Sequence, residues 1–288
     1  MAVEPVQLAK KGTLARCRLM SPYVWREADG TFSMLLRVVD DRGDSTGSLW
    51  FARGDGLEFV PHHGPAVKPG PEPEDVGGCE DPTVVARDDG LLVYYTGVMA
   101  DGTAQLLYAV GPDAHSLGKR GVAHASTAAD HNTKEAAIER LNDGWILLFE
   151  YSRNGRSQIG RAEAESPAGP WTEQENPIRR RKGRWDSWHL STGPLLIDEP
   201  EGPVMFYNGA TPDAVWSIGW VRFDATCRHV VERSIDPLIA APAASGAAGR
   251  RISFAASAVR VEDRIFLYYT HDDRNLMRAT LVCPSSKP

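Results

Sequence analysis

The segment Thr83-Val84-Val85-Ala86-Arg87-Asp88-Asp89-Gly90-Leu91-Leu92-Val93-Tyr94-Tyr95 decides the fold class of this chain. An apolar, β-branched run leads into an Asp-Gly turn, and a second apolar run follows and ends in two tyrosines. Asp-Gly between two apolar runs is a strong signal for a β-hairpin, because glycine readily adopts the positive φ of such tight turns. The segment therefore predicts two antiparallel strands.

The same pattern recurs along the chain at intervals of about 60 residues, close to the period of the longer propeller repeats. The copies centre on the turns Asp29-Gly30, Asp89-Gly90, Asp143-Gly144, Glu201-Gly202 and Glu262-Asp263. A third apolar strand follows in most copies, and the single helix-like window, 134–141, aligns with strands elsewhere. We therefore predict an all-β protein, a five-bladed β-propeller that spans residues 1–288 as one domain. The alternative is a β-sandwich or a pair of β domains. The regular long spacing disfavours it, because a sandwich places turns about every 8–12 residues without a longer period.

Composition and charge limit which ligands and binding partners the protein can have. A net charge of −6 and a pI near 5.8 argue against nucleic-acid binding, which usually requires a basic face. The four cysteines are widely spaced without a CxxC pair, so we expect no metal site, no cofactor and reduced thiols. The N-terminal segment 1–11 has no apolar core of signal-peptide length, and the best apolar stretch, 91–100, is too short to span a membrane. We therefore expect a soluble cytoplasmic protein without a membrane partner. The oligomeric state is left open.

Polar residues stand where the predicted strands begin and end. In Gly77-Gly78-Cys79-Glu80-Asp81-Pro82, the glycines allow a turn, and the proline suits a first strand position because it lacks an N–H. Propeller blades point their first strands at a central channel, so such residues converge on one mouth. The residues predicted to reach it are Arg37, Glu80, Asp81, Tyr95, Lys134, Glu135, Glu150, Trp188, His189, Tyr207, Asn208, Arg251 and Asp273.

This set of side chains is typical of a carbohydrate site. Carboxylates, amides and arginines match the paired hydroxyls of a sugar, and aromatic rings match its C–H faces. Each residue taken alone also fits a solvated loop or a structural ion pair. The basic run Arg179-Arg180-Arg181-Lys182, with Arg184, is a predicted loop that either lies near an anionic ligand or is solvated.

Over nearly all five copies the chain resembles glycoside hydrolase family 130, a family of five-bladed propellers that act on β-mannosides. The resemblance rests on Arg37, Ser48-Leu49-Trp50-Phe51-Ala52, Gly78-Cys79-Glu80-Asp81-Pro82-Thr83, Lys134-Glu135-Ala136-Ala137, His189-Leu190-Ser191-Thr192-Gly193-Pro194, Tyr207-Asn208-Gly209, Asp236-Pro237-Leu238 and Tyr268-Tyr269 to Asp273. It implies that Asp81 is the general acid, which protonates the glycosidic oxygen through a substrate hydroxyl. It also implies that an external nucleophile, inorganic phosphate in most members, attacks the opposite face of the anomeric carbon.

The chain departs from the family where phosphate would bind. Phe149-Glu150 stands where the family has His-Arg, His189 replaces a lysine, and Asn208 replaces a histidine. An arginine expected near Ser48 is missing, and only Arg37 is clearly kept. A carboxylate beside a phosphate dianion is unfavourable in a partly desolvated cavity.

We therefore predict inverting hydrolysis of β-mannosides or related β-linked oligosaccharides. Glu150 is the predicted general base, with Glu135 as its competitor, and the remaining mouth residues would bind the substrate. Two alternatives stay open. One is a phosphorylase whose anion contacts are rebuilt from Arg37, His189 and Arg251. The other is a catalytically silent propeller that binds a glycan or a protein partner.

Overall fold

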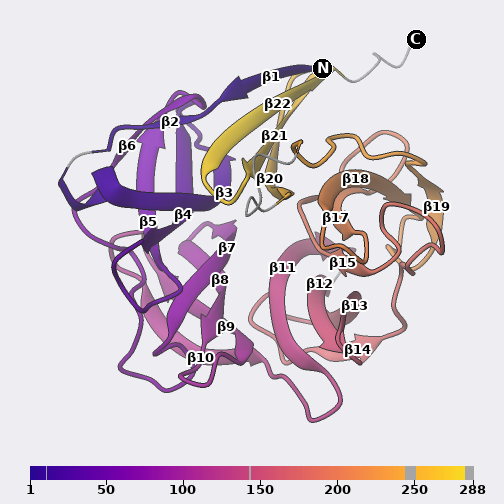
Figure 1. The fold of residues 1–288 in the computed structure, drawn as a ribbon, viewed down its shortest axis with the longest axis horizontal. Coiled ribbons are helices and arrows are strands. Elements are labelled where there is room, and N and C mark those ends of the chain that lie inside the picture. The colour runs from indigo at the N-terminus through magenta and orange to yellow at the C-terminus, as the bar shows by residue number, and fades with distance from the viewer. Residues whose placement is uncertain (11, 143, 244–250, 283–288) are drawn as a thin grey trace.

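Five sheets, antiparallel except for the pair of β2 (Gln7–Leu8) and β6 (Glu58–Pro61), surround a central axis, which confirms the predicted five-bladed β-propeller (Figure 1). The structure, a computed structural model, describes residues 1–288 except 11, 143, 244–250 and 283–288. Asp143 of the third predicted turn and Cys283 therefore lie outside the described residues. The other three cysteines, Cys17, Cys79 and Cys227, are buried free thiols.

We number the blades in chain order. Blade 1 holds β2 (Gln7–Leu8), β3 (Cys17–Arg26), β4 (Phe32–Asp40), β5 (Ser48–Gly54) and β6 (Glu58–Pro61), and a 3-10 helix covers Gly12–Arg16. Blade 2 holds β7 (Gly78–Arg87), β8 (Gly90–Val98), β9 (Ala104–Gly111) and β10 (Gly118–His124). Blade 3 holds β11 (His131–Leu141), β12 (Gly144–Arg153), β13 (Arg156–Ala164) and β14 (Thr172–Gln174). Blade 4 holds β15 (His189–Ser191), β16 (Leu195–Leu196), β17 (Val204–Ala210), β18 (Trp216–Phe223) and β19 (Val230–Arg233). Blade 5 holds β20 (Ser253–Val261), β21 (Arg264–His271), β22 (Asn275–Val282) and β1 (Ala2–Pro5).

The apolar runs of the repeat pack between neighbouring blades. One cluster of buried side chains joins blades 1 and 2 and includes Leu35, Leu49, Val93 and Tyr95. Equivalent clusters fill the other four blade interfaces. Because both faces of each sheet are covered, the strands are apolar on both sides, which explains their nearly continuous hydrophobic runs.

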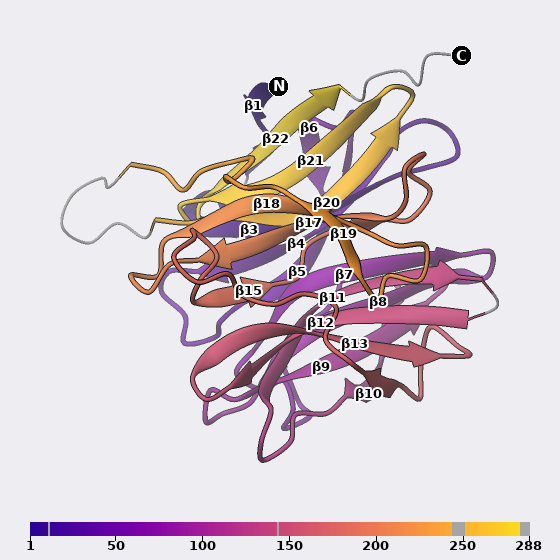
Figure 2. The same ribbon diagram turned by 90° about the vertical axis from the view of Figure 1, so that its right-hand side faces the viewer.

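The two chain ends meet in blade 5. The N-terminal strand β1 pairs with β22 in an antiparallel ladder from Ala2↔Thr280 to Pro5↔Met277, so the last blade is completed from the start of the chain (Figures 1 and 2). This pairing covers an outer edge that would otherwise present unpaired backbone groups. The helix-like window 134–141 lies in β11, the innermost strand of blade 3. No helix in the described part of the chain has the length and hydropathy to cross a membrane.

The innermost strands are irregular at one end, where the propeller has its mouth. Ladder registers shift between Met20 and Tyr23, between Glu80 and Thr83, between Lys134 and Ala136, and between Ala255 and Ser257. In blade 4 the innermost strand is split into β15 and β16. Three consecutive blades place a residue with positive φ at the shift: Ser21 (50°), Asp81 (45°) and Glu135 (49°). Such conformations are uncommon outside glycine and re-aim the side chain.

Candidate active site

A cavity of about 320 Å³ lies at this mouth and receives the re-aimed side chains. Its lining comprises Met20, Ser21, Arg37, Glu80, Asp81, Lys134, Glu135, Glu150, Ser157, Trp216, Ile252, Phe254, Thr270 and Asp273. Seven of these were predicted from the sequence: Arg37, Glu80, Asp81, Lys134, Glu135, Glu150 and Asp273. The cavity therefore collects carboxyl groups from blades 2, 3 and 5.

Arg37 holds the carboxylates of blade 2 in place. Its Nη2 lies 2.6 Å from Glu80 Oε1, its Nη1 lies 3.7 Å from Asp81 Oδ1, and its Nε and Nη2 donate to the Thr46 carbonyl. A Cβ on Gly47, whose φ is 153°, would lie 2.9 Å from Arg37 Cγ. The glycine therefore leaves the room that this guanidinium occupies.

Asp81 accepts hydrogen bonds from two residues at equivalent positions of neighbouring blades, the Ser21 hydroxyl and the Glu135 carboxyl. Burial raises the pKa of the Asp81 carboxyl, but Arg37 and these hydrogen bonds outweigh it and hold the pKa below its usual value. Burial and the Asp81 charge raise the pKa of Glu135 well above its usual value. Of this pair, Glu135 is therefore the carboxyl that keeps its proton to the higher pH.

Lys134 and Glu150 form a second ion pair in the lining. Lys134 Nζ lies 3.6 Å from Glu150 Oε1, and the Glu150 side chain is 4% exposed. The pKa of Lys134 is raised, chiefly by Glu150 and then by Glu135, Asp81 and Glu80. The Lys134 ammonium thus partly compensates the negative charge of these carboxyl groups.

Aromatic rings form the apolar part of the lining. Trp216 and Phe254 lie with ring centroids 5.4 Å apart, and His189 stacks on Trp216 at 5.5 Å and 16°. The His189 Nδ1 accepts a hydrogen bond from the Ser157 N–H, and burial lowers the pKa of the imidazole. The rings and the carboxyl groups together provide both surfaces that a sugar ring requires.

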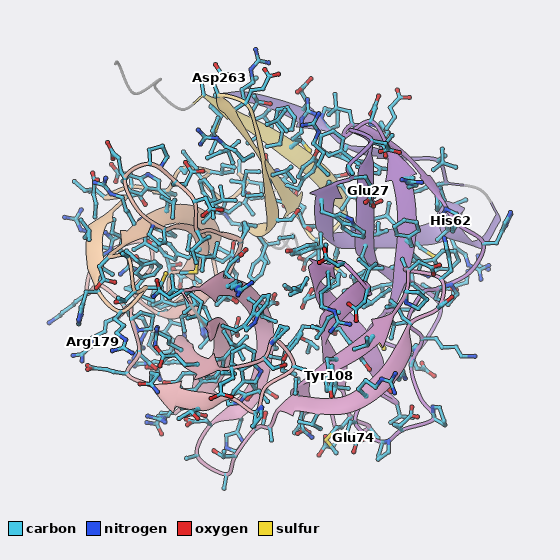
Figure 3. All side chains as sticks on the ribbon, turned by 180° about the vertical axis from the view of Figure 1, so that it is seen from behind. Glu27, His62, Glu74, Tyr108, Arg179 and Asp263 are labelled. Atoms are coloured by element: carbon cyan, nitrogen blue, oxygen red, sulfur yellow. The ribbon has the colours of Figure 1, made fainter. Side chains whose placement is uncertain are left out.

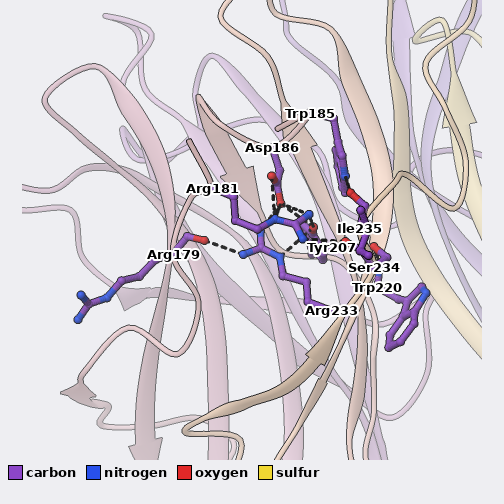
Figure 4. A network of polar contacts seen from close by, with 9 residues as sticks. All are labelled: Arg179, Arg181, Trp185, Asp186, Tyr207, Trp220, Arg233, Ser234 and Ile235. Atoms are coloured by element: carbon purple, nitrogen blue, oxygen red, sulfur yellow. Dashed lines mark hydrogen bonds and ion pairs between the residues drawn. The ribbon is translucent and has the colours of Figure 1, made fainter. Parts of the chain in front are cut away.

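Two predicted binding residues, Tyr95 and Tyr207, are instead part of the packing. Tyr95 is 1% exposed, and its hydroxyl donates to buried Asp75 at 2.9 Å. Tyr207 is fully buried and donates to Asp186 at 2.8 Å, inside the network that Arg181 and Arg233 complete (Figure 4). Both tyrosines lie inside second strands, and each hydroxyl finds its partner inside the protein because a buried phenol needs one.

Asn208 is also fully buried. Its amide donates to the Thr192 carbonyl, and its Oδ1 accepts from the Ala255 N–H at 2.7 Å, which ties blade 4 to blade 5. Arg251 is exposed and donates to the Pro242 carbonyl at 3.2 Å. Neither residue is among those that line the cavity. The structure places Asn208 in the packing between blades, and the contact of Arg251 with a substrate stays a prediction.

Trp188 and His189 are not among the residues that line the cavity. The Trp188 ring carries the Arg156 guanidinium at 4.0 Å, and His189 contacts the lining residues Ser157 and Trp216. Their contact with a substrate stays a prediction.

The most informative residue missed in the sequence is Ser21. Its signal is the repeat itself, since Ser21-Pro22-Tyr23-Val24 matches Asp81-Pro82-Thr83-Val84. Trp216 and Ser157 come from third strands, where no repeat signal marks them. Among the described residues, no group of three or more histidine, cysteine, aspartate or glutamate side chains is placed to hold a metal ion.

No protein-family model matches the sequence, and neither does any curated protein. Solved structures are similar in fold. The β-1,2-mannobiose phosphorylase from Listeria innocua has 18% identity and a TM-score of 0.78, covering 97% of this chain and 90% of its own. A glycosyl hydrolase from Bacteroides ovatus has 21% identity and a TM-score of 0.79, covering 94% of this chain and 85% of its own.

A third structure is described as part of a family, GH130, of mannoside phosphorylases that contains glycoside hydrolases targeting β-1,2-mannosidic linkages in Candida mannan. It has 21% identity and a TM-score of 0.79, covering 94% of this chain and 87% of its own. At these identities the similarity concerns the fold.

Proposed function

We propose that this protein belongs to glycoside hydrolase family 130 and hydrolyses β-mannosides or related β-linked oligosaccharides with inversion at the anomeric carbon. The observation that carries the proposal is the charge of the cavity. Five carboxyl side chains line it, Glu80, Asp81, Glu135, Glu150 and Asp273, against two basic ones, Arg37 and Lys134. Similar folds bind mannobiose or act on mannosides, which supports the substrate class.

Asp81 is the general acid, with Glu135 as the group that stores its proton. A saccharide in the cavity displaces water from Asp81 and makes its charge less favourable, so the shared proton moves from Glu135 to Asp81. Asp81 then protonates the leaving oxygen, directly or through a sugar hydroxyl. Proton transfer of this kind contributes about 10²–10⁴-fold to the rate.

Glu150 is the general base. An inverting hydrolase needs a second carboxylate that removes a proton from water on the face opposite the leaving group. Lys134 orients the Glu150 carboxylate at 3.6 Å. Glu135 is less suited to this role because it already holds the proton that it shares with Asp81.

Hydrolysis is favoured over phosphorolysis by electrostatics. Two unit charges 4 Å apart interact by about 4 kcal/mol at an effective dielectric constant of about 20. A phosphate dianion next to Glu150 would meet this repulsion, while both basic side chains of the lining already face carboxylates. A water molecule is neutral, so it can bind next to Glu150 without this repulsion.

Leaving-group dependence tests the acid assignment. We expect Asp81→Asn to lower kcat/KM for a β-linked manno-disaccharide by about 10²-fold or more. The same variant should retain most of its activity on a dinitrophenyl β-mannoside, whose leaving group needs no protonation. Equal losses on both substrates would contradict the assignment, and so would an undiminished rate on the disaccharide.

The base assignment needs a different variant. Glu150→Gln should lose activity on both substrates, since activation of water is needed whichever group leaves. Full activity of this variant on either substrate would exclude Glu150 as the base.

A further inference from the structure

The predicted basic run of blade 4 divides into three different environments. Arg179 points into solvent, with a side chain that is 81% exposed and 2.9 Å from Glu175, and it projects from the outer edge of the molecule (Figure 3). Arg181 lies 2.8 Å from buried Asp186. Arg180, between them, is half-buried and turns toward Trp188, to whose carbonyl it donates.

A second guanidinium lies beside Arg180. Arg156, at the start of β13, is also half-buried and lies over the Trp188 ring at 4.0 Å. The two cations are close enough that Arg156 adds to the effect of burial and lowers the pKa of Arg180. Within the described part of the chain, neither makes an ion pair with a carboxylate. Two half-buried like charges without a counterion repel each other, and an oxyanion between them would relieve that repulsion.

A hollow of about 470 Å³ adjoins this pair and is lined by Tyr151, Gln158, Arg180 and Leu190, among others. Its carboxylates already have basic partners: Asp130 with Arg153 at 2.5 Å, Glu173 with His124 at 3.2 Å and Glu175 with Arg179 at 2.9 Å. In β13 the strand β14 pairs only with Arg161, Ala162 and Glu163. The hollow lies along the part of the β13 edge that β14 does not cover.

The arginine pair, Arg156 and Arg180, lies next to the catalytic cavity. Ser157 lines the cavity and follows Arg156 directly, and its N–H donates to His189 at 3.0 Å. His189 lies within the electrostatic reach of Glu150 and Lys134 on one side and of the arginine pair on the other. A saccharide that extends from the cavity past His189 would bring a substituent to this pair.

We propose that Arg156 and Arg180 form an oxyanion subsite, and that the saccharide acted on carries a carboxylate or a phosphate ester. The inference rests on the proposed function, because it extends the substrate of the same cavity. Arginine suits this role, since its planar guanidinium donates two parallel hydrogen bonds to a carboxylate or phosphate.

The test compares neutral β-linked manno-disaccharides with analogues that bear a hexuronic acid or a sugar phosphate in either ring. We expect the wild type to prefer an acidic substrate. Arg156→Gln and Arg180→Gln should each lower the acidic-to-neutral ratio of kcat/KM by about tenfold, in line with hydrogen bonds to charged groups. Arg179→Gln is the matched control, and it should leave the ratio within about twofold. Thermal unfolding of each variant verifies its fold.

A ratio that is unchanged in both Arg156→Gln and Arg180→Gln would overturn the subsite. Turnover that requires inorganic phosphate and yields a sugar 1-phosphate would also overturn it, because the oxyanion would then be a free cosubstrate. Hydrolysis of neutral disaccharides tests the proposed function separately from the subsite. If the protein does not hydrolyse them, calorimetry still tests the subsite. Binding of the hexuronic disaccharide that is lost in Arg180→Gln and kept in Arg179→Gln would support it.

Discussion

Replacing Lys134 with methionine tests how the cavity keeps its carboxylates charged. The ammonium lies 3.6 Å from Glu150, whose side chain is 4% exposed. At an effective dielectric constant of about 20 this attraction amounts to about 4–5 kcal/mol, and removal of one partner of a buried pair commonly costs about 3–5 kcal/mol. We therefore expect Lys134→Met to lower the free energy of unfolding by about 3–4 kcal/mol at pH 8.

The loss should depend on pH. The variant can avoid a bare buried carboxylate by binding a proton. Relative to a glutamate of the unfolded chain, this costs about 5 kcal/mol at pH 8 and about 1 kcal/mol at pH 5. The deficit should therefore shrink to about 1 kcal/mol at pH 5. Lys134 itself stays charged over this range, because its pKa is raised above 10.5.

Urea unfolding of the wild type and the variant at both pH values measures this deficit. Lys68→Met is the matched control, since Lys68 is exposed, and such surface changes stay within about 0.5 kcal/mol. A deficit below about 1 kcal/mol at pH 8, or one that does not vary with pH, would refute the reasoning.

Three further changes have defined outcomes. Because the pKa of Glu135 is raised in the folded state, its protonated form stabilises the fold, and that stability is lost as pH rises through the raised value. Glu135→Gln should therefore unfold at a higher temperature than the wild type at pH 8, with little difference at pH 4. Its activity should fall. Equal unfolding temperatures at pH 8 would count against a proton shared by Glu135 and Asp81. Gly47→Ala should lower kcat/KM about tenfold or more by displacing Arg37, and a crystal structure of the variant with Arg37 unmoved would contradict this. Tyr207→Phe should lose about 1–3 kcal/mol of stability, measured by urea unfolding, because Asp186 loses a buried hydrogen-bond donor. The variant should keep the wild-type KM. A raised KM would indicate that Tyr207 contacts the substrate.

The sequence predicts the fold well because each blade repeats one local signal. An acidic or glycine turn between apolar runs fixes a hairpin, and regular spacing between turns fixes the number of blades. The closure by β1 carries no such signal. Ala2–Pro5 is a short, mostly exposed strand whose partner, β22, lies at the other end of the chain. Pairing between such distant segments is invisible to a local pattern.

The candidate site was predictable where it coincides with the repeat. Glu80, Asp81, Lys134 and Glu135 stand at equivalent strand entries, and alignment of the copies would also have identified Ser21. Tyr95, Tyr207 and Asn208 differ, because the sequence suggested the mouth and the structure places them in the packing. A polar or aromatic residue in such a strand faces either the mouth or the neighbouring blade. Strand register decides between these two directions, and the sequence does not reveal it.

Product analysis in ¹⁸O-labelled water, with and without inorganic phosphate, tests the central claim most directly. The account predicts that a β-linked manno-disaccharide is cleaved at the same rate in both conditions. One ¹⁸O atom should appear at the anomeric carbon, and the first sugar released should have the α configuration. Formation of mannose 1-phosphate in proportion to added phosphate, or release of the β anomer, would contradict it.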